Sequence, residues 1–494
     1  MLSHDTNHAS NRYNQFKMNR RKFVKSNTLA LTAFSLLPLS SFGFDYKDRL
    51  ISKRPPLSNR TFTSDVIERQ IIKIKSAIKD KELAWMFENC YPNTLDTTID
   101  YEVIDGKPDT FIITGDIDAM WLRDSTAQVW PYMPLVKKDD KIKNLIKGLI
   151  NRQVKCIIKD PYANAFYKDL EKESHWQSDN PTPIPGVHER KWEIDSLCYA
   201  VRLSYYYYQL TNDKSIFDTQ WDKAMRLVYK TFKTEQREDG TSPYYFVRKT
   251  DNMIDAPMFK GDGRPTKFTG LIHSQFRPSD DATLFPMLIP SNIFAEISLI
   301  QLHEIYSDVL GDAAFAAKCH SFAIELNKAI EKHAIAEHLD YGKIYAYEID
   351  GFGNKVFMDD ANVPSLMSLA YLKPEFKNQD VYSNTRRFLL SENNPYYLKG
   401  KAAEGQGSPH TGKNTIWPMG IILRALTSED KSEIMYCLKM LKNTHAGTGF
   451  MHEAFNKDNP KNFSRSWFAW ANTLFGELIV KIYEINPELL EHEI

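Results

Sequence analysis

The chain has few cysteines for its length and no group of residues spaced like a metal site. Its five cysteines are scattered over 494 residues without a CxxC pair. The sequence therefore indicates neither a disulfide framework nor a zinc site, and buried free thiols are expected. HxH, HExxH and Asp-rich metal spacings are missing as well, so we expect no metal and no cofactor.

Neither sign of charge dominates, and no long apolar run is present. Lys plus Arg and Asp plus Glu number 63 each, which argues against a nucleic-acid-binding chain and against an acidic tail. A bilayer-spanning helix needs about 18 consecutive apolar residues, and no segment reaches that length. We therefore expect no nucleic-acid partner and no membrane-spanning segment.

The N-terminus carries the pattern of an export signal. The basic segment NRRKFVK (19–25) contains Arg20 and Arg21 and precedes a short apolar run, Leu29–Leu39. This order resembles a bacterial twin-arginine signal. We divide the chain into an export signal (1–43), a linker (44–63) and one domain (64–494), and we expect an exported, periplasmic protein.

Helical patterns dominate the rest of the chain and come in consecutive pairs. Ser64 is placed to cap a first helix whose apolar residues continue to Ile78. Further helices are expected at 83–90, 125–135, 142–158, 193–210, 221–232, 292–310, 313–333, 363–372, 382–390, 416–426, 431–441 and 467–485. Strand patterns are confined to 101–113, 244–247 and 342–357, with a hairpin turn at Asp350-Gly351.

About twelve paired helices separated by polar, aromatic-rich loops predict an all-α fold. The arrangement favoured is an (α/α)6 toroid with small β-hairpin insertions, in which the loops at one end converge on a central cup. A helical solenoid is the alternative, but no fixed-period repeat supports it.

The densest chemical motif is the segment Thr114–Ser125. Five side chains in it combine carboxylates, a guanidinium and an indole within nine residues: Asp116, Asp118, Trp121, Arg123 and Asp124. Charged residues are seldom buried unless paired, and this mixture suits a polyhydroxylated ligand held through hydroxyls and a ring face. The alternative is a helix N-cap with a local salt bridge.

Other loops place carboxylates beside Gly, Pro, His or Trp. They contain His188, the adjacent pair Asp280 and Asp281, His410, and His452 beside Glu453. Glycosidic hydrolysis needs one protonated and one ionised carboxyl group. Asp280 or Asp281 as the acid and Glu453 as the base would meet in the cup, and a neighbouring charge would raise the pKa of the acid.

Structural alternatives exist for each of these residues. The Asp280-Asp281 pair could cap a helix, Glu453 could be a surface residue, and Glu193 and Asp195 could pair with Arg190 or Lys191. The three histidines are read as hydrogen-bond donors to a ligand or a loop rather than metal ligands.

Several ordered motifs together resemble one family. They are TGDIDAMWLRDSTAQVWPY (114–132), KWEIDSLCY (191–199), RPSDDA (277–282), LIPSN (288–292), GSPHTG (407–412) and GFMHEAF (449–455). This set is similar to the metal-independent exo-α-1,6-mannosidases of glycoside hydrolase family 125. The resemblance implies an (α/α)6 fold, inversion of configuration, and removal of non-reducing terminal α-1,6-linked mannose.

The resemblance also implies residue roles. Asp280 corresponds to the general acid and Glu453 to the general base. Arg123 and Asp124 are expected in the terminal mannose subsite, and further substrate contacts are expected from Asp116, Asp118, Trp121, His188, Asp281, His410 and His452.

The expected partner is a mannose-containing oligosaccharide or N-glycan, and the expected assembly is a monomer. Two other functions remain open. One is a different glycosidase on the same toroid, such as a glucoamylase-like α-glucosidase. The other is a non-catalytic glycan-binding protein of the cell envelope.

Overall fold

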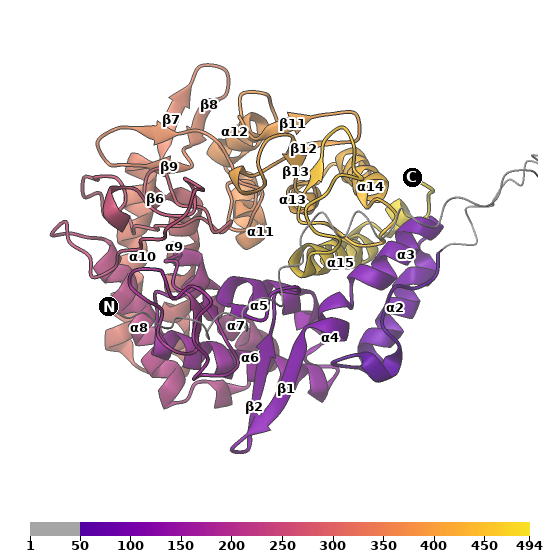
Figure 1. The fold of residues 1–494 in the computed structure, drawn as a ribbon, viewed down its shortest axis with the longest axis horizontal. Helices are drawn as coiled ribbons and strands as arrows, with labels where there is room; N and C mark the ends of the chain where they lie inside the picture. The colour runs from indigo at the N-terminus through magenta and orange to yellow at the C-terminus, as the bar shows by residue number, and fades with distance from the viewer. Residues whose placement is uncertain (1–49) are drawn as a thin grey trace, which may run out of the picture. The chain divides into compact units, whose positions relative to one another are not determined.

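Helices are the main regular structure of residues 50–494, which are the residues that the computed structural model describes; the predicted export signal lies outside them. Figure 1 shows these helices following one another around the unit formed by Leu50–Ile494. Their bounds are α2 (Asp65–Ala77), α3 (Lys81–Cys90), α4 (Asn93–Thr97), α5 (Leu122–Val129), α6 (Asp140–Lys159), α7 (Ile194–Thr211), α8 (Thr219–Glu235), α9 (Ile289–Glu304), α10 (Ala313–His333), α11 (Leu369–Leu372), α12 (Asp380–Leu389), α13 (Pro418–Leu426), α14 (Lys431–Thr444) and α15 (Ala469–Ile485).

The longer helices fall into an inner and an outer set, and the sequence explains the division. Helix α2 begins where Ser64 Oγ accepts the Ile67 N–H, and it buries Ile67, Ile71 and Ile74 on one stripe, as an amphipathic outer helix should. Helices α7, α9, α13 and α15 are instead buried along most of their length. Such all-round burial identifies inner helices.

The inner helices form a ring. Helix α5 packs on α7, α7 on α9, and α9 on α11, while α13 packs on α15 and α15 returns to α5. Outer and inner helices alternate along the chain, for example α8 then α9, and α14 then α15. This arrangement confirms the predicted (α/α)6 toroid.

The strands are short and form small antiparallel sheets. Their bounds are β1 (Ile99–Ile104), β2 (Lys107–Ile112), β3 (Met120–Trp121), β4 (Ala165–Phe166), β5 (Val187–Glu189), β6 (Met287–Leu288), β7 (Ile335–His338), β8 (Gly342–Tyr345), β9 (Glu348–Ile349), β10 (Lys355–Val356), β11 (Tyr397–Lys399), β12 (Glu404–Gln406), β13 (Thr415–Ile416) and β14 (Phe455–Asn456). Strands β1 and β2 pair from Ile99 opposite Ile112 to Ile104 opposite Lys107. Asp105 and Gly106 both have positive φ at the tip, as a two-residue hairpin turn requires.

The hairpin turn expected at Asp350-Gly351 is also present. It connects β9 to β10, which pair antiparallel. The Asp350 carboxylate accepts the N–H groups of Phe352 and Asn354, which explains why Asp leads this turn. The strand predicted at 244–247 was wrong, because only an isolated bridge between Val247 and Asn180 forms there.

Two helix predictions were also inaccurate. Only Leu369–Leu372 of the predicted helix 363–372 is helical, because the Asp359 carboxylate takes the N–H groups of Leu366 and Met367 and competes with a helix. The helix predicted at 292–310 begins three residues earlier, at Ile289, with Pro290 in its first turn, where proline is well suited.

The cysteines behave as expected: all five are free and buried. Within residues 50–494, no helix combines the length and apolarity needed to cross a membrane.

Candidate functional site

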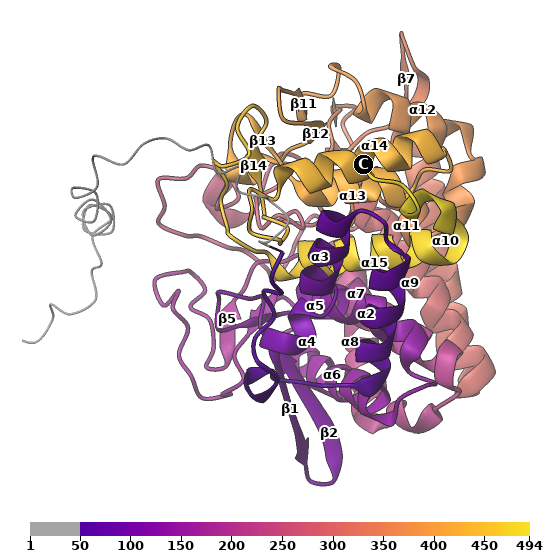
Figure 2. The same cartoon turned by 90° about the vertical axis from the view of Figure 1, so that its right-hand side faces the viewer.

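One narrow cavity collects most of the chemical motifs. It is lined by Thr114, Ile117, Trp121, Arg123, Asp124, Pro278, Ser279, Asp280, Asn362, His410, Trp417, Glu453, Arg465, Phe468 and Trp470. These residues lie in the first turns of inner helices α5 and α15 or in the loops that lead into α5, α9, α11, α13 and α15. Figure 2 shows β13 and β14, which belong to two of these loops, on the same side of the helices. Inner helices that run the same way bring these ends together, and the positive ends of their dipoles favour carboxylates there.

The two predicted acid and base residues, Asp280 and Glu453, line the same cavity. Asp280 precedes α9 and Glu453 precedes α15, which are the third and sixth inner helices along the chain. The two carboxyl groups therefore reach the cavity from loops that lead into helices on opposite sides of the ring. Arg465 Nε lies 3.4 Å from Glu453 Oε1 and orients this second carboxylate.

Asp280 has a strained backbone. Its φ is +66°, in the left-handed region that non-glycine residues seldom adopt. The turn is held by the Asp280 N–H donating to the Arg277 carbonyl at 2.9 Å and by the Arg277 N–H donating to the Asp281 carbonyl at 2.8 Å. Strain of this kind, which surrounding structure must maintain, is frequent at functional sites, and here it aims a single carboxyl group into the cavity.

Arg123 is the electrostatic centre of the site. Its guanidinium lies 2.5 Å from Glu193, 3.1 Å from Asp195, 3.4 Å from Asp124 and 3.5 Å from Asp280. The interpretation that Glu193 and Asp195 pair with Arg190 or Lys191 was wrong, because those cations contact other carboxylates instead. Four carboxyl groups thus share one buried cation.

Protonation in this cluster differs from the sequence expectation. Burial disfavours ionised Asp280, but Arg123 and Lys191 outweigh burial and lower its pKa, whereas burial raises the pKa of Glu193 well above its usual range. Asp281 was expected to raise the pKa of its neighbour. Instead, the Asp281 carboxylate accepts a hydrogen bond from His410 Nδ1 at 2.9 Å.

His410 is cationic at neutral pH. Burial disfavours the imidazolium, but the hydrogen bond and charge of Asp281, together with Asp280 and Glu453, raise the pKa of His410 to about 9. The ring lies at the cavity lining beside Trp417, with centroids 6.2 Å apart. It is therefore placed to donate to a ligand from Nε2.

This pairing predicts a pH-dependent stability. A histidine pKa raised from 6.5 to about 9 contributes stability that is complete below about 6.5 and is lost as pH rises through 9. The melting-temperature difference between wild type and His410→Gln should be largest near pH ~6 and vanish near pH ~10. The expected size is on the order of 1 °C, because the ring is 36% exposed and solvent screens the pair. Calorimetry across this range measures it, and a difference independent of pH would contradict the assignment.

Several polar atoms of the cavity wall have no hydrogen-bond partner among the described residues. They are Thr114 Oγ1, Trp121 Nε1, Arg123 Nε and Asp124 Oδ2, all buried; the last two lie 3.4 Å apart as an ion pair. Unsatisfied buried polar atoms are rare in folded proteins and require an explanation. Donors and acceptors side by side in one cavity match a ligand rich in hydroxyl groups, each of which can donate and accept.

Five of the predicted ligand contacts do not line this cavity; one of them is Asp281, which binds His410. Asp116 is 59% exposed and pairs with Arg465 at 3.0 Å, and Asp118 is 79% exposed and pairs with Lys172 at 2.7 Å. His188 lies behind Trp121, with ring centroids 5.3 Å apart. His452 Nδ1 donates to the Arg465 carbonyl at 2.6 Å. Asp116, His188 and His452 thus contact lining residues from outside the cavity, whereas Asp118 pairs at the surface.

Sequence reasoning missed the lining residues Asn362, Trp417, Arg465, Phe468 and Trp470. The segment Ser464–Trp470 (SRSWFAW) mixes arginine and aromatic residues directly before a helix, which is the same signal that drew attention to Thr114–Ser125. That signal could have identified Arg465 and Trp470.

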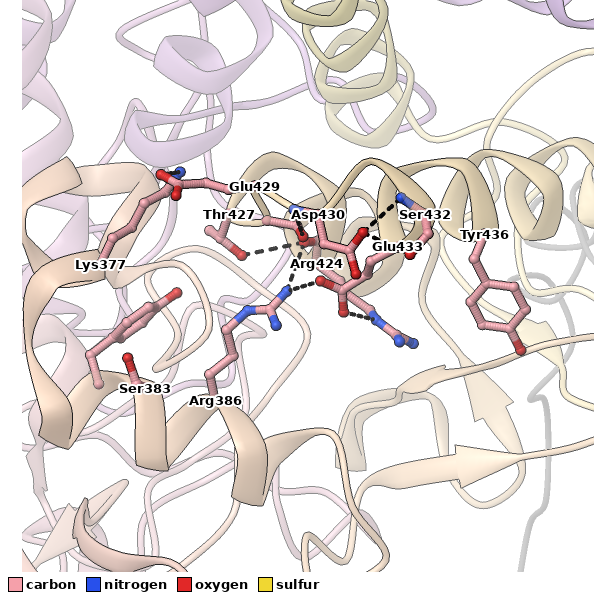
Figure 3. Close-up of a pocket in the computed structure, with 12 residues that line it drawn as sticks. Lys377, Ser383, Arg386, Arg424, Thr427, Glu429, Asp430, Ser432, Glu433 and Tyr436 are labelled. Carbon is pink, nitrogen blue, oxygen red and sulfur yellow. Dashed lines mark hydrogen bonds and ion pairs between the residues drawn. The ribbon is translucent and has the colours of Figure 1, made fainter. Parts of the chain in front are cut away.

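A larger hollow elsewhere lacks these features. It measures about 680 Å³, against about 50 Å³ for the cavity, and lies between α12, α13 and α14. Figure 3 shows Arg386 and Arg424 directed at Glu433, with contacts of 2.7 and 2.8 Å. Its charges neutralise one another, and none of its lining residues has a left-handed backbone. The smaller cavity combines the strained Asp280 with Glu453 and is therefore the candidate site.

Within residues 50–494, no three His, Cys, Asp or Glu side chains are grouped so that they could hold a metal ion.

Comparisons with known proteins agree on one family. A family model described as metal-independent alpha-mannosidase (GH125) matches residues 80–480. The chain is 43% identical over 466 residues to the meiotically up-regulated gene 157 protein of Schizosaccharomyces pombe, covering 90% of each chain.

Solved structures give the same result. A metal-independent α-mannosidase of Streptococcus pneumoniae, in a non-productive complex with α-1,6-mannobiose, is 39% identical with a TM-score of 0.82. The match covers 86% of this chain and 100% of that one. A family GH78 rhamnosidase of Bacillus sp. GL1 is 12% identical with a TM-score of 0.50, over 83% of this chain and 35% of that one, which shows a shared fold alone.

Proposed function

The chain belongs to glycoside hydrolase family 125, the metal-independent α-mannosidases, and from this premise we propose that it removes terminal α-1,6-linked mannose with inversion of configuration. The observation that carries the proposal is that Asp280 and Glu453 line one cavity whose wall also presents buried donors and acceptors without hydrogen-bond partners among the described residues. The α-1,6-mannobiose bound to the pneumococcal relative supports the linkage.

In the proposed mechanism, Asp280 protonates the glycosidic oxygen as the bond to the anomeric carbon breaks. Glu453 removes a proton from a water molecule that attacks the same carbon from the opposite face. Direct activation of water requires carboxyl groups about 6.5–9.5 Å apart. The loops that carry Asp280 and Glu453 lead into α9 and α15, which lie on opposite sides of the inner ring, and this favours the wide spacing over a covalent intermediate.

The narrowness of the cavity favours exo action on one terminal sugar. Arg123 Nε, Asp124 Oδ2 and Trp121 Nε1 would hold its hydroxyl groups, and the charged His410 would donate to a hydroxyl or to the glycosidic oxygen. Interactions that strengthen as positive charge develops on the ring would accelerate the reaction.

Purified protein incubated with α-1,2-, α-1,3- and α-1,6-mannobiose tests the proposal. We expect mannose from the α-1,6 isomer alone, undiminished by EDTA. Early proton NMR spectra should show β-mannose before mutarotation. If α-mannose appears first, the proposed inversion is wrong. Hydrolysis of aryl α-glucosides but not of aryl α-mannosides would instead identify the enzyme as an α-glucosidase.

The N-terminal pattern supports a second proposal, that the enzyme is exported to the periplasm and that residues 64–494 are its catalytic domain. Replacing Arg20 and Arg21 by lysine should leave the full chain in the cytoplasm of a bacterial host. Equal periplasmic recovery of both forms would contradict a twin-arginine signal.

A further inference from the structure

Glu193 is a carboxyl group behind the proposed catalytic acid, outside the cavity lining. It is fully buried, and its Oε2 accepts hydrogen bonds from Arg123 Nη1 at 2.5 Å and from Ser196 Oγ at 2.9 Å. Its second oxygen, Oε1, has no hydrogen-bond partner among the described residues that meets strict geometry. Glu193 and Asp280 bind the two terminal nitrogens of the same Arg123 guanidinium, at 2.5 and 3.5 Å, and each affects the pKa of the other. Oε1 is therefore the Glu193 oxygen that remains to share a proton with Asp280.

The charges around this pair do not balance if every carboxyl group is ionised. The groups that face it are Arg123 and Asp124 from α5, Lys191 and Asp195 from the segment entering α7, and His410 from the loop before α13. Lys191 is shared with Glu189 and Asp255. An isolated buried charge is too costly to persist, and such a group takes up a proton instead. At least one carboxyl of the cluster must hold a proton.

We propose that Glu193 is a positioning residue that holds this proton in the resting enzyme, donates it in a hydrogen bond to Asp280, and reloads Asp280 for catalysis. This inference rests on the proposed function. The fully buried position of Glu193 and its free Oε1 favour it as the proton holder over Asp280, which lies on the cavity and also accepts from Asn164 Nδ2 at 3.3 Å. Proximity of Glu193 to Arg123 would stabilise the carboxylate that remains after transfer.

The proposed step conserves protons and electrons. The proton passes from Glu193 Oε1 to Asp280 and from Asp280 to the glycosidic oxygen, which keeps the electron pair of the broken bond to the anomeric carbon. Glu453 takes one proton from the attacking water. After the product alcohol and mannose leave, Glu453 releases that proton to solvent and the Asp280–Glu193 pair takes one up, so the net reaction consumes one water.

The Glu193→Gln variant tests the proposal, because an amide can donate to Asp280 but cannot give up a proton. We expect kcat on α-1,6-mannobiose, whose leaving group needs protonation, to fall roughly 10²-fold. Turnover of 2,4-dinitrophenyl α-mannoside, whose leaving group needs none, should remain close to wild type. The alkaline limb of the pH profile of kcat/KM should move to lower pH. In this variant the proton must reside on Asp280, and the nearby cations Arg123 and Lys191 favour its loss.

Asp195→Asn is the matched control, since Asp195 is equally buried and binds the same Arg123 nitrogen at 3.1 Å. It should affect both substrates alike. The role of Glu193 would be overturned if Glu193→Gln lost turnover equally on both substrates. It would also be overturned if Asp195→Asn showed the same dependence of turnover on the leaving group. Wild-type protein inactive on both mannosides would instead overturn the proposed function.

A second variant covers the case in which Glu193→Gln fails to fold. Ser196→Ala removes the hydroxyl that donates to Glu193 Oε2, which makes the ionised form of Glu193 less favourable. The alkaline limb of kcat/KM should then move to higher pH. An unmoved limb in folded Ser196→Ala protein would count against the proposal.

Discussion

The Glu453→Gln variant is expected to hydrolyse α-1,6-mannobiose roughly 10²- to 10⁴-fold more slowly than wild type, the usual contribution of a general base. Glutamine retains the shape of glutamate but cannot accept the proton of the attacking water. Because Glu453 contacts Arg465 at 3.4 Å across a solvent-connected cavity, the substitution should change the melting temperature little. Initial rates of mannose release and thermal unfolding measure both effects.

Glu429→Gln provides the matched control. Glu429 is 81% exposed and pairs with Lys377 in the hollow of Figure 3, so its loss should leave turnover unchanged. Azide, a nucleophile that needs no deprotonation, should partly restore turnover of an activated aryl mannoside in Glu453→Gln and yield the β-mannosyl azide. Wild-type rates in Glu453→Gln would exclude Glu453 as the base.

The Arg123→Leu variant is expected to lose about 3–5 kcal/mol of unfolding free energy, the typical cost of removing one partner from a buried ion pair. The carboxylates of Asp195 and Asp124 would remain buried without their shared cation. Protonation relieves such charges, so the destabilisation should shrink as pH falls. Burial already raises the pKa of Asp124 to about 6 in the intact cluster, and loss of Arg123 would raise the pKa further. Urea unfolding at neutral and mildly acidic pH measures the change.

Arg226→Leu is the corresponding surface substitution. Arg226 also contacts two carboxylates, Asp222 at 2.9 Å and Asp312 at 2.6 Å, but it is 42% exposed. Solvent-screened pairs contribute about 0.2–1 kcal/mol, so this variant should be nearly as stable as wild type. Equal losses of unfolding free energy in Arg123→Leu and Arg226→Leu would show that burial does not determine how strongly the Arg123 ion pairs stabilise the protein.

The fold was predictable because its signals are local and repeated. Amphipathic spacing such as Ile67, Ile71 and Ile74 in α2, and the continuous apolar character of α9, identify outer and inner helices before any contact is known. The failures had equally local causes in hindsight. Side chains such as Asp359 took backbone N–H groups away from a predicted helix, a competition that apolar periodicity does not register.

The sequence predicted which residues belong to the candidate site better than it predicted their contacts. Carboxylates beside glycine and aromatic residues identified Arg123, Asp280 and Glu453, which the structure brings to one cavity. The same density of charge also selected Asp116 and Asp118, which form surface pairs. A high density of charged residues in a sequence does not show which side chains of a loop point into the cavity and which point to solvent, because that direction depends on the backbone conformation of the loop.

The sequence by itself determined the helical pairing, the family and the residue types available to the chemistry, because these follow from periodicity and from short ordered motifs. Only the tertiary structure decided which charges meet. Arg123 gathers Glu193, Asp195 and Asp280 from segments 70 to 157 residues away, and Asp281 binds His410 rather than acting on its neighbour. Protonation depends on distance and burial, and both are set by the closure of the helical ring.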